Sequence, residues 1–167
     1  MFWIICLGIA TGMRTMTGIA VVCWAAYFGW LPVQGTWAFW TAKLVSVIVF
    51  TVFALGEYVV DTLPTTPSRT APFPLTARLS FGILVCVVMA TVLVQPKAGG
   101  VILGVLGALI GAYGGRRVRA LGARLVGRDL PVALVESGLA LGLSVLTAWS
   151  IHAQILGYTD PALVTPR

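Results

Sequence analysis

The sequence predicts an all-α protein: a polytopic bundle of about five transmembrane helices that forms a single integral membrane domain over residues 1–167. Hydrophobic residues make up 59% of the chain and charged residues only 10%, whereas an average soluble domain is about 25% charged. Long apolar runs alternate with short polar segments, and about 20 apolar residues are enough to cross a bilayer. These observations exclude a soluble enzyme, a disordered linker and a secreted disulfide scaffold.

The first expected span covers residues 2–30 and is interrupted by Arg14. It is longer than one perpendicular span requires. We therefore expect it either to tilt or to break near Gly8, Gly12 and Gly18 into two half-helices.

Four further spans are expected, over residues 37–60, 78–95, 98–115 and 130–153. The polar segment 61–77 contains four prolines, which argue against a continuous helix there.

Glycines recur at intervals of four residues in the expected span 98–115. This spacing forms a flat strip on one helix face, along which a second helix can approach closely. We expect Gly104, Gly107 and Gly111 to lie at such contacts, and the alternative is a hinge or a contact between subunits.

Most arginines lie in the segments that follow the second and fourth spans. The positive-inside rule places both segments in the cytoplasm, and we expect a bacterial inner-membrane protein with a cytoplasmic N-terminus. If the first run is re-entrant, it does not cross the membrane, and this assignment of the N-terminus fails. The net charge of +6 therefore indicates orientation rather than nucleic-acid binding. Contact with anionic lipids is expected, and the alternative is a phosphate clamp of Arg69, Arg78, Arg116 and Arg117.

Arg14 is expected near the centre of the bilayer, where an isolated arginine costs from about 2.5 to more than 10 kcal/mol. Glu57, Asp61 and Glu136 are expected at similar depth or at the membrane edge, so at least one of them should pair with Arg14. The pair could simply fix the register of the helices. Alternatively, a surplus carboxylate could line a hydrated site for cation binding or proton coupling.

A weak inverted repeat is suggested by two similar segments. Residues 12–15 (GMRT) precede Glu57, and residues 114–117 (GGRR) precede Glu136. In a five-span bundle these two halves would run antiparallel about the third span.

Several short motifs resemble those of a known family. They are Gly12-Met13-Arg14, the carboxylates Glu57 and Asp61 followed by Pro64, residues 67–70 (PSRT), and a carboxylate in the last span. In these motifs the chain resembles the domain-of-unknown-function family 4126, small bacterial integral membrane proteins. The resemblance implies a membrane location and a polar set of Arg14, Glu57, Asp61 and Glu136. It departs from the family's late Glu-Asp pair, because Ser137 follows Glu136.

Three functions are compatible with these features. The leading hypothesis is a homo-oligomeric channel or transporter for a small ion or solute, because five short helices enclose little space within one subunit. The second is an intramembrane enzyme acting on a phosphorylated lipid or head group, with a divalent cation at Glu57 and Asp61. The third is a non-catalytic membrane scaffold. No P-loop or nucleophile motif is present, so a non-enzymatic role without a cofactor is favoured.

Overall fold

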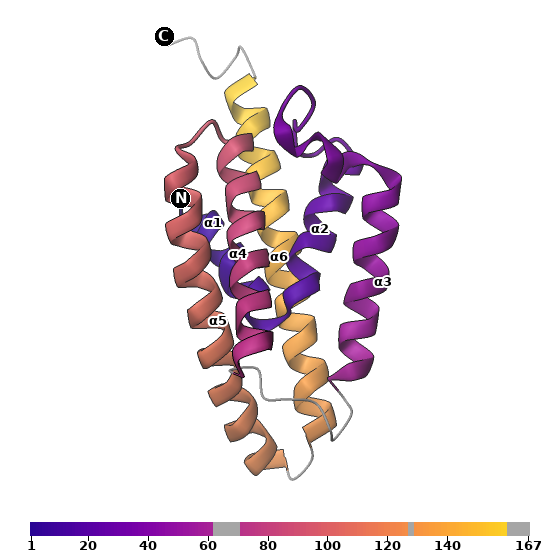
Figure 1. The fold of residues 1–167 in the computed structure, drawn as a ribbon, viewed down its shortest axis with the longest axis vertical. Helices are drawn as coiled ribbons and strands as arrows, with labels where there is room; N and C mark the ends of the chain where they lie inside the picture. The colour runs from indigo at the N-terminus through magenta and orange to yellow at the C-terminus, as the bar shows by residue number, and fades with distance from the viewer. Residues whose placement is uncertain (62–70, 127–128, 160–167) are drawn as a thin grey trace.

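The computed structural model describes residues 1–61, 71–126 and 129–159, and over these residues the chain is all-helical (Figure 1). The elements in chain order are α1 (Phe2–Met13), α2 (Thr15–Tyr27), the 3-10 helix η1 (Trp37–Ala42), α3 (Leu44–Val60), α4 (Pro72–Val92), α5 (Lys97–Val126) and α6 (Asp129–Thr159). The predicted all-α class is confirmed.

Among the residues that the structure describes, three helices are long and apolar enough to cross a membrane: α4, α5 over Lys97–Gly122, and α6 over Pro131–Gly157. Helices α1, α2 and α3 are apolar but shorter. The chain therefore has the character of an integral membrane protein, while the expected count of about five spans is not confirmed.

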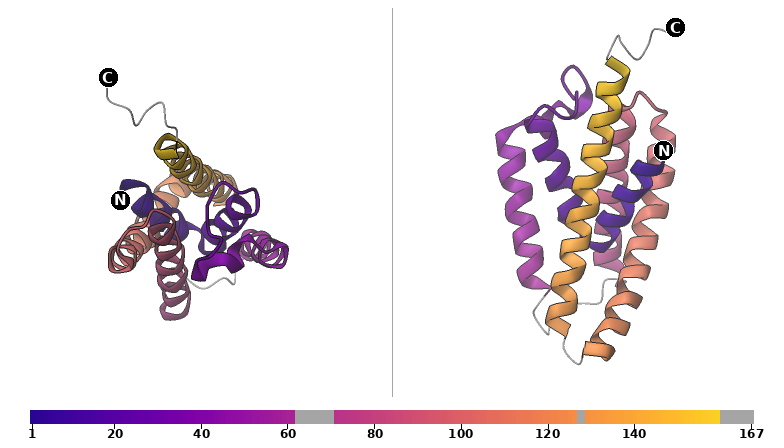
Figure 2. Two further views of the ribbon diagram at one scale, coloured as in Figure 1. Left: turned by 90° about the horizontal axis from the view of Figure 1, so that it is seen from above. Right: turned by 180° about the vertical axis from the view of Figure 1, so that it is seen from behind.

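The first apolar run consists of two half-helices, α1 and α2, which meet at Arg14. Arg14 has an extended backbone, with φ −138° and ψ 108°, and this conformation ends one helix and begins the next. The chain turns back at this point, so α1 and α2 form a V inside the bundle (Figures 1 and 2).

The two open ends of the V, near Met1 and Trp30, lie towards the same end of the bundle. The Met1 side chain lies close to Gly99 near the start of α5, and the Trp30 carbonyl oxygen lies 3.0 Å from Nδ1 of His152 near the end of α6. The arginine-bearing end of α5 lies at the opposite end of the bundle (Figure 1). The N-terminus and the arginine-bearing end of α5 thus lie towards opposite ends of the bundle (Figure 1), whereas the five-span prediction placed both on one side of the membrane.

Two expected loops are helical where the structure describes them. Helix α4 already begins at Pro72, because proline is tolerated in the first turn, where an N–H has no helical partner. Helix α5 continues to Val126, so the arginines expected in a loop lie on its last turns. The two segments of the suggested repeat differ in local structure: residues 114–117 lie within continuous α5, whereas residues 12–15 span the break.

The second expected span is divided. Residues 37–42 form η1, and Lys43 has an extended backbone before α3 begins at Leu44. Thr36 caps η1 by accepting a hydrogen bond from the Ala38 N–H.

The glycines of α5 lie at very close helix contacts. Gly104 faces α4, while Gly107 and Gly111 face α1. A methyl group added to Gly111 would lie only 2.1 Å from the Ile9 carbonyl oxygen. These small residues allow α1 to lie deep against α5, and so they place the break at Arg14 inside the bundle.

Candidate functional site

The break between α1 and α2 brings two helix ends into the interior of the bundle. The last carbonyl groups of α1 and the first N–H groups of α2 have no partners within their own helices. In a bilayer interior such groups cost several kcal/mol each unless the protein satisfies them. Two side chains from neighbouring helices supply the partners.

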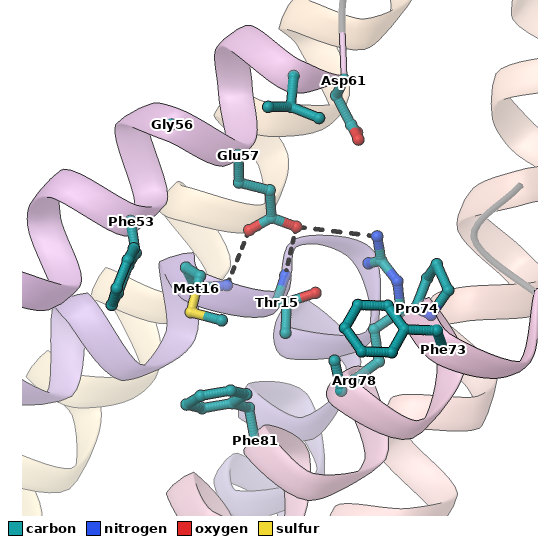
Figure 3. A pocket seen from close by; sticks show the side chains of 12 residues that line it. Thr15, Met16, Phe53, Gly56, Glu57, Asp61, Phe73, Pro74, Arg78 and Phe81 are labelled. Carbon is teal, nitrogen blue, oxygen red and sulfur yellow. Dashed lines mark hydrogen bonds and ion pairs between the residues drawn. The ribbon is translucent and has the colours of Figure 1, made fainter. Parts of the chain in front are cut away.

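Glu57 of α3 caps the N-terminus of α2. Its Oε1 accepts a hydrogen bond from the Thr15 N–H and its Oε2 accepts one from the Met16 N–H, each at 2.8 Å (Figure 3). A negative charge at a helix N-terminus is also stabilised by the helix dipole. Next to it, the Thr17 and Tyr58 hydroxyl groups share a hydrogen bond of 2.9 Å, which ties α2 to α3 a second time.

Arg78 of α4 caps the C-terminus of α1. Its Nη1 donates to the carbonyl oxygens of Gly12 and Met13, both at 2.8 Å, and its Nη2 lies 3.8 Å from Oε1 of Glu57. Sequence reasoning placed Arg78 at the membrane edge. Because α4 begins at Pro72, Arg78 instead lies about 9 Å along the helix and is buried.

Arg14 is fully buried and pairs with Asp61 at the end of α3. Its Nη2 donates to the Ala133 carbonyl oxygen of α6 at 3.3 Å, and its guanidinium lies over the Tyr58 ring, 5.4 Å from the ring centre. Arg119 of α5 contacts the same Asp61, with Nη1 3.5 Å from Oδ2 and Nη2 donating to the backbone oxygen at 3.2 Å.

Glu136 is buried on α6, about one turn beyond Ala133. It lines a cavity of about 280 Å³ between α1, α5 and α6, together with Arg119. Glu136 and Arg119 thus extend the charged region to the side of the break opposite Glu57.

The described residues of this region form a balanced cluster, which we call the break cluster: Arg14, Arg78 and Arg119 with Glu57, Asp61 and Glu136. One of the two sequence-based hypotheses had a carboxylate in excess of Arg14. In the structure Arg78 and Arg119 contribute further positive charge, because they project from helices that extend further than predicted.

A larger cavity of about 570 Å³ opens beside Glu57, between α2, α3 and α4 (Figure 3). We call it the Glu57 cavity. Its charged lining residues are Glu57, Asp61 and Arg78, and most of the remaining lining is apolar, including Phe53 and Phe81.

The other predicted site residues are distributed differently. Arg69 lies outside the described residues, while Arg116 and Arg117 are exposed on α5 and Arg78 is buried at the break. The described members of the expected phosphate clamp are therefore divided between a buried and an exposed position. Over the described ranges, no group of three or more His, Cys, Asp or Glu side chains converges in a way that could hold a metal ion.

Comparisons of the chain with protein-family models, with curated proteins and with solved structures find no match. The function is therefore argued from the chemistry of the site itself.

Proposed function

We propose that this protein is a channel or transporter that moves a small ion or solute across a membrane, with the break cluster as its binding site. The observation that carries the proposal is the pair of half-helix ends held by Glu57 and Arg78 beside the Glu57 cavity. Discontinuous helices whose ends meet inside the bilayer are a recurring way for transporters to bind charged solutes.

The cost of the break favours a functional role for it over a purely structural one. A continuous helix satisfies its own backbone groups, whereas this break needs a buried arginine and a half-buried glutamate to satisfy four backbone groups. Buried charges inside membranes are costly and are commonly associated with ion or solute pathways.

We also propose a membrane topology. Helices α3, α4, α5 and α6 cross the bilayer, and α1 with α2 form a re-entrant pair. Helix α3 has 17 residues and a length of about 26 Å, close to the thickness of the hydrocarbon core. The arginine-bearing end of α5 faces the cytoplasm of a bacterial inner membrane, so Met1 faces the opposite side.

The topology is tested by site-specific accessibility in intact cells. From outside the cell, an N-terminal epitope tag is expected to bind its antibody. Val94→Cys, in the turn after α4, is expected to react with an impermeant maleimide from the same side. Arg124→Cys is expected to react with an impermeant maleimide only after permeabilisation. Background labelling is low because Cys6, Cys23 and Cys86 are buried. A tag that becomes accessible only together with Arg124→Cys would contradict the re-entrant topology.

We also propose that the chain is related to domain-of-unknown-function family 4126, which it resembles in sequence. Arg14, Glu57 and Asp61, which carry that resemblance, converge at the break. We further propose a homo-oligomer in contact with anionic lipids, because a single thin bundle offers little room for a complete aqueous path.

Transport is tested with the purified protein in liposomes that contain a pH-sensitive dye. Potassium, sodium, chloride and tetraethylammonium gradients are imposed in turn with a protonophore present, so that proton movement reports their flux, and a proton gradient is imposed without it. We expect protein-dependent flux of at least one probe, reduced at least tenfold by Glu57→Gln and by Arg14→Ala. Arg117→Gln is the matched control, since it removes an exposed charge outside the break cluster and should leave flux unchanged.

Two results would contradict the proposal. The first is the absence of flux for every probe, and the second is flux equal to wild type in both Glu57→Gln and Arg14→Ala. If both variants lower thermal stability while no flux is detected, the scaffold function is supported instead. Divalent-metal binding that Asp61→Asn abolishes would favour the enzyme.

A further inference from the structure

We infer that the Glu57 cavity binds an amphiphilic organic cation, an ammonium or phosphonium centre that carries apolar groups. This inference rests on the proposed function and deepens it, because it names the class of solute for the same site. It depends on the size of the cavity, on which charged groups its lining presents, and on the aromatic rings around them.

The cavity has the dimensions of a small-molecule site. Its volume of about 570 Å³ lies within the range of about 300–1,000 Å³ that is typical of ligand pockets. The walls are predominantly apolar, which suits the hydrophobic groups of an amphiphile better than a hydrated inorganic ion.

The accessible charges of the cavity are negative. The side chains of Glu57 and Asp61 are 14% and 10% exposed, whereas that of Arg78 is only 4% exposed. Arg78 also directs Nη1 at two backbone carbonyl oxygens, so part of its donor capacity is committed to α1. Each Glu57 oxygen accepts one backbone N–H; Oε1 also faces Nη2 of Arg78, whereas Oε2 retains a further lone pair for a ligand. Asp61 is paired with Arg14 and Arg119, so an entering anion would meet the Glu57 carboxylate first.

Aromatic rings complete the arrangement. Phe53 from α3, and Phe73 and Phe81 from α4, line the cavity around Glu57 (Figure 3). The faces of aromatic rings carry partial negative charge and attract organic cations, as in the aromatic cages that bind quaternary ammonium groups. A carboxylate beside three phenylalanines thus offers both the charge and the apolar contact that such a cation requires.

Binding is tested with tetraphenylphosphonium on the purified full chain in a neutral detergent, by equilibrium dialysis. Tetraphenylborate has nearly the same size and shape with the opposite charge, so it controls for partition into micelles. We expect saturable binding of tetraphenylphosphonium alone. Glu57→Gln should weaken this binding at least tenfold.

A second variant keeps the test decisive if Glu57→Gln unfolds the break. Phe53→Leu combined with Phe81→Leu keeps the lining apolar but removes two aromatic rings. This double variant should weaken the binding of tetraphenylphosphonium several-fold. Phe2→Leu, outside the cavity, is the matched control and should bind as wild type. Unchanged affinity in both cavity variants, or equally tight saturable binding of tetraphenylborate, would overturn the inference.

The outcomes separate this inference from the proposed function. Saturable, Glu57-dependent binding without flux of any probe would support the cation site and contradict transport. Flux that depends on Glu57, without saturable binding of tetraphenylphosphonium, would support transport and overturn the cation site.

Discussion

Replacing Gly111 with alanine tests the contact that places the helix break inside the bundle. The added methyl group would lie 2.1 Å from the Ile9 carbonyl oxygen and within 3 Å of the Gly12 backbone, so α1 would have to retreat by about 1.3 Å to reach ordinary contact. Backbone atoms cannot rotate away as a side chain can. We therefore expect a cost at the upper end of the overpacking range, about 3 kcal/mol.

For a chain of this size, that cost corresponds to a decrease of about 6–12 °C in melting temperature. The assay is heating in the presence of a thiol-reactive fluorescent dye, because Cys6, Cys23 and Cys86 are buried and react only on unfolding. Gly114→Ala on the same helix is the matched control, since an added methyl group there meets no other atom within 4 Å. Equal melting temperatures for the two variants would refute the close approach of α1 to α5.

Three further predictions concern the capping charges and use the same melting assay. Arg78→Gln should cost about 3 kcal/mol, because it removes a buried cation and disrupts the cap of α1. Glu57→Gln should cost about 1–2 kcal/mol, since its amide can accept only one of the two α2 N–H groups. Arg14→Met and Asp61→Asn should each destabilise, and their combination should cost at least 1 kcal/mol less than the sum, because the two residues are paired.

Arg117→Gln is the control for these charge variants, because it removes an exposed arginine from α5 and should shift the melting temperature little. An Arg78→Gln protein that melts like Arg117→Gln would show that the cap of α1 contributes nothing. Additive effects of Arg14→Met and Asp61→Asn would contradict their pairing. Greater loss in Glu57→Gln than in Arg78→Gln would reverse the expected order of the two caps.

The apolar runs and buried charges could be predicted from composition and depth, since both follow from the cost of placing polar groups in lipid. The turn between α1 and α2 could not, because the apolar pattern of residues 2–30 is the same for one long span and for two half-helices. Only packing decides between them. Gly107 and Gly111 allow α1 to pack closely against α5, and with α1 in this position the chain turns at Arg14.

The roles of Arg78 and Arg119 could not be predicted because they depend on where helices end. The prolines near residue 72 argue against a helix in their segment, yet a first-turn proline is compatible with one, so α4 begins early enough to carry Arg78 inside the bundle. The arginines after Gly115 suggest a loop, yet arginine is a good helix former and α5 continues through them. The expected span boundaries therefore did not place Arg78 and Arg119 among the charged residues around Arg14.

The charges at the break have the signs that the helix dipoles require. Glu57 faces the positive N-terminus of α2, and Arg78 faces the negative C-terminus of α1, so each charge is stabilised by the helix end that it caps. The two charges are also close enough to attract each other, but their separation of 3.8 Å is longer than a direct hydrogen bond. Glu57 can therefore exchange part of its contact with Arg78 for a ligand while it still holds α2. On the proposed function, this makes Glu57 rather than Arg14 the group that binds the solute, while Arg14, paired with Asp61 and enclosed on every side, holds the break in place.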